Sequence, residues 1–142
     1  MPNYSEIKQF PYTQSQLFDL VGDVEDYPNF LPWCLDVNIE ERRDNIINAN
    51  MTVGFRFVRE SFSSLVTLTP TSQIDVEYVE GPFRYLINRW RFKETANGCE
   101  VDFYIDFEFQ SSLLRLAVEP VFLEAVKRMV TAFECRAVER FS

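Results

Sequence analysis

The stretch Tyr27-Pro28-Asn29-Phe30-Leu31-Pro32-Trp33-Cys34 places three aromatic rings and two prolines within eight residues. Each proline lacks a backbone N–H and disfavours the α-helical region for the residue before it, so the segment should form a stiff, bent connector. Such a connector is too apolar to be an ordinary solvated loop. Its rings should either plug one end of a hydrophobic core or line the rim of an apolar pocket.

Helical signals precede this connector. Residues 4–10 can form a first strand, which Pro11 ends. Thr13 followed by Gln16 is a capping-box signature, and the apolar residues after it predict a short helix that ends near Gly22. A second, shorter helical turn is expected at 24–27, directly before the aromatic connector.

The hydrophobic period changes to two after the connector and stays so from residue 35 to residue 110. Turn signals at 44–45, 70–72, 81–82 and 97–98 divide this region into about six antiparallel strands. The alternation is clearest in 101–110, where one face is apolar and the other carries acidic and polar residues. Asn88 interrupts the apolar side of the preceding strand. Another alternating set runs from Ile47 to Phe57, with Gly54 as a candidate bulge or bend.

The period becomes helical again after Ser111-Ser112. A broad apolar stripe from Leu114 to Phe133 predicts one long C-terminal helix. Pro120 lies inside this pattern, so the helix should be kinked or broken near Glu119.

This order predicts an α+β fold, with a curved antiparallel sheet of about seven strands wrapped around the C-terminal helix and two short helices after the first strand. We find no linker or internal repeat, so residues 1–142 should form a single domain. The helix and the connector would enclose a cavity, and cavities of this kind normally take apolar ligands. The alternative is that phenylalanines fill the space, which close packing of protein interiors favours over an open pocket.

Composition narrows the possible functions. The chain has 22 acidic and 14 basic residues, a formal charge of −8, which opposes non-specific attraction to DNA, RNA or anionic lipid. It has no histidine, the commonest proton-transfer group and metal ligand. The three cysteines are far apart and suggest neither a disulfide framework nor a metal site. We therefore expect a cytoplasmic protein without a metal, a signal peptide or a membrane-spanning helix.

An enzymatic activity would need a positioned acid, base or nucleophile. Asp102, Asp106 and Glu108 share the wet face of one strand and are expected to be solvated. Cys34 lies in the aromatic connector without a feature that would stabilise its thiolate, so a buried structural role is expected. The sequence predicts no catalytic residue and no required cofactor.

Three sequence segments resemble those of a known family: Tyr27–Cys34, Gly81–Phe92 and Met129–Ala137. In this order they resemble the coenzyme Q-binding START-like family, within the polyketide cyclase/dehydrase-like superfamily. That family includes mitochondrial ubiquinone-binding proteins and bacterial ribosome association toxins. The resemblance implies the helix-grip fold, also called START-like or Bet v 1-like, with a lipid-sized cavity.

The resemblance implies that the connector and the turn at 82–83 flank the cavity mouth, while the last strand and the C-terminal helix supply its walls. Phe103, Phe107 and Phe133 are expected to belong partly to the core, whereas Trp33, Phe83 and Leu86 could equally pack in the core or touch the ligand. Weak candidates for contacts to a quinone oxygen are Tyr85, Asn88, Arg89 and Trp90. The predicted ligand-binding residues are Tyr27, Phe30, Leu31, Trp33, Pro82, Phe83, Leu86, Trp90, Phe103, Phe107, Phe122, Val126 and Met129.

The expected function is binding of ubiquinone or a related polyprenyl lipid, as a quinone carrier or chaperone that supports respiratory electron transport. Transient contacts with the inner face of the membrane and with quinone-biosynthesis or respiratory proteins would accompany it. The alternative is a ribosome-associated, toxin-like protein that interferes with subunit association through a local patch of Arg84, Arg89, Arg91 and Lys93. The sequence leaves the native lipid and the oligomeric state open.

Overall fold

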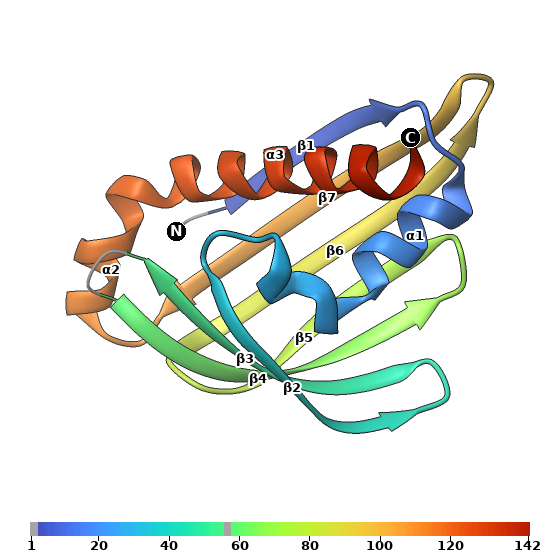
Figure 1. Cartoon of the computed structure of the whole chain (residues 1–142). Helices are drawn as coiled ribbons and strands as arrows, with labels where there is room; N and C mark the ends of the chain where they lie inside the picture. The colour runs from blue at the N-terminus through green and yellow to red at the C-terminus, as the bar shows by residue number, and fades with distance from the viewer. Residues whose placement is uncertain (1–2, 56–57) are drawn as a thin grey trace.

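A computed structural model describes residues 3–55 and 58–142 and shows one sheet with helices on one of its faces (Figure 1). The side chain of Phe55 and the predicted alternation at Phe57 lie outside the described residues. The elements in chain order are β1 (Asn3–Phe10), α1 (Gln14–Gly22), the 3-10 helix η1 (Val24–Asn29), β2 (Cys34–Arg43), β3 (Ile46–Phe55), β4 (Val58–Thr69), β5 (Gln73–Glu80), β6 (Phe83–Thr95), β7 (Gly98–Phe109), α2 (Ser112–Val118), the 3-10 helix η2 (Glu119–Val121) and α3 (Phe122–Phe141).

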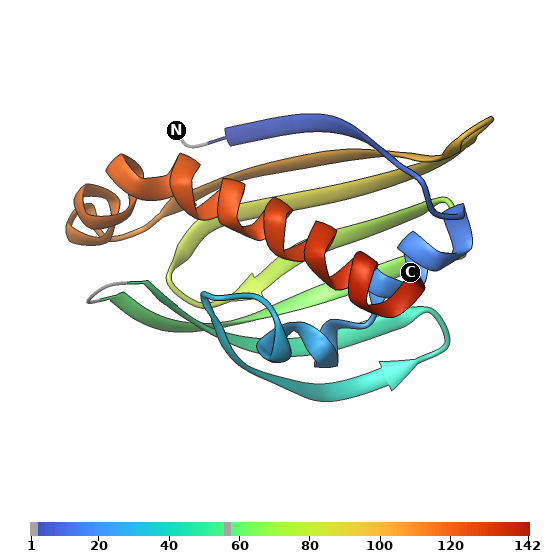
Figure 2. The ribbon, with the colours of Figure 1, turned by 45° about the horizontal axis from the view of Figure 1, so that its top comes forward.

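The seven strands form one antiparallel sheet in the order β1-β7-β6-β5-β4-β3-β2. Consecutive strands from β2 to β7 are neighbours, and β1 pairs with β7. The sheet curves around α3, which crosses its concave face, while α1 and η1 lie beside the C-terminal half of α3 (Figures 1 and 2). This arrangement confirms the predicted α+β, helix-grip fold.

Two local predictions are confirmed at atomic detail. The Thr13 hydroxyl accepts a hydrogen bond from the Gln16 backbone N–H at 3.0 Å, and the Gln16 side chain accepts one from the Thr13 N–H at 2.9 Å. The turn before β7 uses Gly98 at φ +144°, where a Cβ would lie 2.1 Å from the Phe10 carbonyl oxygen. Only glycine therefore allows the end of β1 to approach this turn.

The predicted irregularity at Gly54 lies on the neighbouring strand instead. Gly54 pairs regularly with Arg59, whereas the β2–β3 register shifts between Cys34 and Asp36. The Leu35 side chain covers Gly54 and would lie 2.8 Å from a Cβ there. The missing side chain therefore makes room for the bulge of β2.

Of the two proline-containing helical segments, the first is longer than predicted, and the second is broken near Glu119 as predicted. The helical turn before the connector extends to Asn29 and includes Pro28, because its 3-10 form tolerates the proline near its end. The C-terminal helix is divided at Pro120 into α2, η2 and α3, as the missing proline N–H requires. The turn that this division introduces directs α2 away from the axis of α3 (Figure 2).

Two packed clusters occupy the two ends of the space between the sheet and the helices. Under α1 and the C-terminal half of α3, side chains such as Leu20, Ile74, Cys99 and Ala137 are fully buried and packed together. A second cluster of phenylalanines lies under α2. Both alternatives considered from the sequence therefore hold in part: phenylalanines and other apolar side chains fill the ends, and a cavity remains between the two clusters.

Candidate ligand-binding cavity

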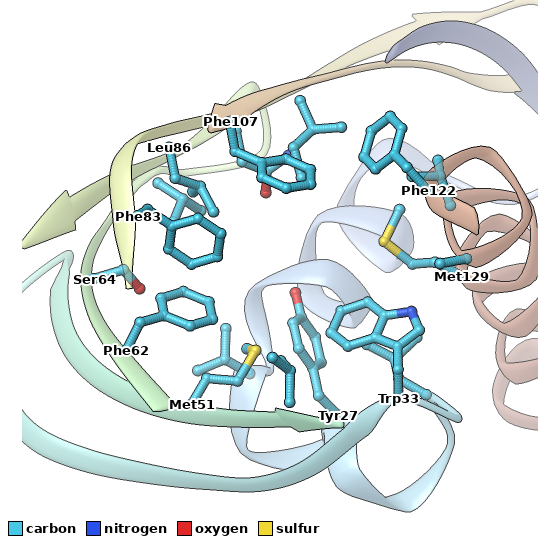
Figure 3. Close-up of a pocket in the computed structure, with 18 of the residues that line it drawn as sticks. Tyr27, Trp33, Met51, Phe62, Ser64, Phe83, Leu86, Phe107, Phe122 and Met129 are labelled. Atoms are coloured by element: carbon cyan, nitrogen blue, oxygen red, sulfur yellow. The ribbon is translucent and has the colours of Figure 1, made fainter. Parts of the chain in front are cut away.

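An apolar cavity of about 220 Å³ lies between the sheet, the N-terminal half of α3 and the aromatic connector (Figure 3). Side chains from β3 to β7 form its floor and walls, and α2, η2 and α3 form its roof. Its lining residues are Val24, Tyr27, Leu31, Trp33, Ala49, Met51, Val53, Gly54, Val58, Phe62, Ser64, Val66, Ile74, Val76, Phe83, Leu86, Asn88, Trp90, Phe103, Ile105, Phe107, Phe109, Val118, Val121, Phe122, Ala125, Val126, Met129 and Phe133.

The alternation of side chains along β6 and β7 places aromatic residues on the wall of the cavity. Leu86 and Trp90 on β6 stand opposite Phe107 and Phe103 on β7, so their side chains share the concave face. The Trp90 ring centroid lies 4.6 Å from that of Phe103. The Phe107 ring reaches the roof, with its centroid 5.0 Å from that of Phe122. Such ring pairs stabilise one another beyond their burial alone, which makes this wall stiff.

The structure brings all the predicted ligand-binding residues to the cavity lining except Phe30 and Pro82. The Phe30 ring packs against Phe133, with centroids 5.2 Å apart, and the Arg136 guanidinium lies 5.4 Å from its centroid. The Pro82 carbonyl accepts a hydrogen bond from the Gln110 N–H at 2.9 Å. These two residues therefore support the connector and the β5–β6 turn from outside the lining.

The contribution of β3 and β4 to the cavity was not predicted from the sequence. The alternating set that begins at Ile47 was available as a signal, but its inward residues could not be separated from ordinary core residues. Ser64 could not be recognised as a polar residue on an apolar strand face, because it lies in a serine-rich part of β4 where the alternation of apolar and polar residues is not visible. The residues missed from this half of the sheet include Ala49, Met51, Val53, Phe62, Ser64 and Val66.

The connector is fixed between the cavity and α3. The Tyr27 hydroxyl donates a hydrogen bond to the Val21 carbonyl, and burial raises the pKa of Tyr27 far above its ordinary value. On η1, Asp26 accepts two hydrogen bonds from the Arg136 guanidinium, at 2.8 and 3.0 Å. Burial alone would raise the pKa of Asp26, but the hydrogen bonds from Arg136 and Asn29 outweigh it and hold the pKa below its ordinary value. The connector is thus tied to the helix that roofs the cavity.

Polar groups are scarce in the cavity. Among the described residues that line it, none is Asp, Glu, Lys or Arg. Asn88 is the predicted interruption of the apolar side of β6. Its amide accepts a hydrogen bond from the Trp90 indole N–H and donates one to the Tyr104 carbonyl, each at 3.0 Å. The cavity therefore favours an uncharged ligand, because an unpaired charge placed there would lose its hydration without compensation.

Two of the weak candidates for a quinone contact lie on the opposite, convex face. The Tyr85 hydroxyl donates a hydrogen bond to Asp106 at 3.1 Å, and the Arg89 guanidinium lies 5.6 Å from the centroid of the Tyr104 ring. Only Asn88 and Trp90 of the four line the cavity.

Cys34 is buried outside the lining, and burial raises the pKa of its thiol to about 12. This thiol is therefore protonated and unreactive at neutral pH.

The sheet, its gripped helix and the apolar cavity define a START-like protein built to hold a hydrophobic ligand. A START superfamily protein from Mycobacterium smegmatis has the same fold, with a TM-score of 0.81 and 17% identity over 96% of this chain and 97% of that chain. The chain belongs to the family described as polyketide cyclase / dehydrase and lipid transport, which matches residues 10–134.

Two named relatives fit the two functions considered from the sequence. The ribosome association toxin RatA of Escherichia coli strain K12 is 36% identical over 100% of this chain and 90% of its own length. The mitochondrial coenzyme Q-binding protein COQ10 homolog B of Xenopus laevis is 34% identical over 94% of this chain and 57% of its own length. Among the described residues, no helix is both long and apolar enough to cross a membrane.

Proposed function

We propose that this protein binds ubiquinone or a related uncharged prenyl lipid in the cavity, and that it acts as a quinone carrier or chaperone for respiratory electron transport. The observation that carries the proposal is a largely apolar cavity whose described lining contains no charged side chain. A fatty acid or phospholipid head group would find no cation there. The similarity to a coenzyme Q-binding protein supports the quinone among neutral lipids.

The size of the cavity sets how the ligand is held. A volume of about 220 Å³ is below the usual range for drug-sized ligands, roughly 300–1,000 Å³. We infer that the cavity encloses the ring and the first part of the tail. Burial of each methylene-sized unit contributes about 0.8 kcal/mol, so a few such units give useful affinity with few polar contacts.

Catalysis is not part of the proposal. The described lining offers Tyr27, Ser64 and Asn88 as side chains with oxygen atoms, and the Tyr27 proton is held by a buried hydrogen bond and a raised pKa. A general acid or base works best with a pKa near the operating pH, which no residue of this set provides. The proposed activity is therefore binding and transfer.

Loading requires contact with a bilayer, where such lipids reside. On α2, Leu113 and Leu116 are 76% and 74% exposed, while Leu114 and Val118 of the same helix pack against the phenylalanine cluster. This helix roofs one end of the cavity and lies at the end of the molecule away from the C-terminus (Figure 2). We propose that these two exposed leucines touch the inner, cytoplasmic face of the membrane while the ligand enters or leaves.

Tryptophan fluorescence tests the proposed function directly. The chain has two tryptophans, and both Trp33 and Trp90 line the cavity. Titration with decylubiquinone should therefore quench the fluorescence in a saturable manner, with an affinity of about 1 μM or tighter. The tail-less quinone head group should bind much more weakly. An absence of saturable quenching by decylubiquinone would contradict the proposal.

A second candidate function, interference with ribosomal subunit association, is favoured by the full-length similarity to RatA. The convex face carries the predicted basic residues, but acidic neighbours pair with several of them. The Arg84 side chain lies 3.0 Å from Glu108, and Arg91 lies 3.0 Å from Asp75. Any contact with ribosomal RNA should therefore be local and weak.

Co-sedimentation with isolated ribosomal subunits at several salt concentrations tests this second function. We expect a slope of log affinity against log salt no steeper than about −2, which corresponds to about two phosphate contacts. Tight binding with a steep slope, together with no quenching by decylubiquinone, would establish the ribosome as the partner and remove the lipid proposal.

A further inference from the structure

The Ser64 hydroxyl lies in the apolar cavity wall and has no hydrogen-bond partner among the described residues. The residue is 4% exposed, and within the described part of the chain its hydroxyl makes no hydrogen bond. Figure 3 shows it on the cavity side of β4, at the wall formed by Phe62 and Phe83. Burying a hydroxyl without a hydrogen bond destabilises the folded protein, so an apolar residue would suit the empty cavity better.

The serines next to Ser64 in the chain behave differently. The Ser63 hydroxyl, on the convex face, donates to Glu40 at 3.1 Å and accepts from Asn50 at 3.2 Å. The Ser61 hydroxyl shares a hydrogen bond of 2.8 Å with Thr52. The missing partner is thus specific to the serine that faces the cavity.

Asn88 supplies a second polar position on the same concave face. Val76 on β5 pairs with both Val66 and Asn88, so Asn88 lies two strands away from Ser64 and two residues along. Strand spacing places their Cα atoms roughly 11 Å apart. With its two hydrogen bonds made, the Asn88 amide still has one N–H and part of its oxygen free. A ring with oxygens on opposite sides could lie between these two positions.

We propose that Ser64 is the head-group contact of the ligand, which binds with its polar ring at the β4 wall and its tail directed past Met129 and Trp33. Those two residues stand on the opposite side of the cavity in Figure 3. The proposal deepens the proposed function and rests on it. It names the ligand class as a neutral amphiphile with hydrogen-bond acceptors on its ring, as in a prenylated quinone, in preference to a plain hydrocarbon.

The test compares decylubiquinone with decylbenzene, which has the same tail and a ring without oxygens. Tryptophan quenching measures the first ligand, and displacement of decylubiquinone measures the second. The Ser64→Ala variant should bind decylubiquinone about three- to tenfold more weakly, the effect of one lost hydrogen bond, and decylbenzene as well as the unchanged protein does. Its melting temperature without ligand should stay the same or rise. The control Ser63→Ala should melt at a lower temperature with both affinities unchanged.

The variants Ser64→Thr and Ser64→Val add a test at constant side-chain shape. The two side chains differ only in that threonine carries a hydroxyl where valine carries a methyl group. The threonine variant should keep the preference for the quinone, and the valine variant should lose it. Equal affinities of the threonine and valine variants for decylubiquinone, or equal losses for both ligands, would overturn the head-group assignment. Failure of the unchanged protein to bind either compound would instead remove the proposed function.

Discussion

Neighbouring residues in and around the connector have different roles: some side chains line the cavity, and others pack in the protein interior. Trp33 lines the cavity, whereas Cys34 beside it is buried away from the lining and starts β2. Phe30 was predicted to touch ligand but packs against Phe133 on α3. The sequence could show that these rings must be buried, but their direction depends on the 3-10 geometry of the segment before them. The segment contacts Phe133 and Arg136 of α3, which lie more than a hundred residues later in the chain.

Val126 on α3 tests at the residue level whether the cavity is occupied by ligand. Its side chain is buried and lines the cavity. The substitution Val126→Lys should place an aliphatic stem in the cavity while the ammonium reaches toward the rim, so the protein should remain folded and lose most of its bound lipid. Thermal unfolding and lipid extraction from the same preparation measure both effects.

A close-packed site would respond differently to this lysine. The buried charge would then destabilise the protein far beyond the roughly 1 kcal/mol typical of point mutations. A variant that unfolds would therefore contradict the cavity at this position. A folded variant that stays fully loaded would show that Val126 does not touch the ligand.

At the scale of elements, changes of hydrophobic period could predict most of the fold. The capping box defined the start of α1, and the alternation in β6 and β7 defined which face is buried. The cavity could not be predicted from the sequence in the same way. The periodicity of Met51 or Phe62 is the same whether a core residue or a space lies opposite, and the outcome depends on how far α3 stands from the sheet. Pro120 ends α2 before α3 begins, which lets the two helices take different directions.

The ion pair between Asp26 on η1 and Arg136 on α3 should stabilise this arrangement of elements. Their side chains are 14% and 24% exposed and form two charge-assisted hydrogen bonds. We expect Asp26→Asn to lower the free energy of unfolding at pH 7 by about 1–2 kcal/mol, measured by urea denaturation. The exposed pair of Glu124 and Arg128 is the control, and Glu124→Gln should cost less than about 0.5 kcal/mol.

The pH dependence of this difference has a definite sign. The pKa of Asp26 is lower in the folded protein than its ordinary value, so its contribution is complete above the ordinary pKa of an aspartate, about 3.9. It is lost as the pH falls through the lower folded-state pKa. The difference between the unchanged protein and Asp26→Asn should therefore shrink in acid. A difference that grows below pH 4 would contradict the assigned ion pair.

On the scale of the whole molecule, a net charge of −8 surrounds a cavity that is itself uncharged along its described lining. The acidic surface should keep the protein from staying on anionic membranes. Contact with a bilayer then depends on apolar side chains near the cavity. Leu113 and Leu116 on α2 are the most exposed of the large apolar side chains described there.

Extraction of ubiquinone from phosphatidylcholine vesicles tests this role of α2. The double variant Leu113→Ser/Leu116→Ser should extract ubiquinone about tenfold more slowly, because the apolar contact with the bilayer is lost, while its melting temperature stays the same. The control Ile7→Ser removes a side chain of similar exposure, 64%, from the edge strand β1. Equal extraction rates for all three proteins would contradict membrane contact through α2. Addition of anionic lipid to the vesicles should not speed extraction.

The most direct test of the central claim is mass spectrometry of an organic extract from protein purified without detergent. The claim predicts a neutral prenylated ring compound, with ubiquinone as the expected species, in the extract of the unchanged protein. The same compound should be depleted in the extract of a folded Val126→Lys variant. An extract that contains only charged lipids, or no lipid at all from protein with an intact fold, would contradict the claim.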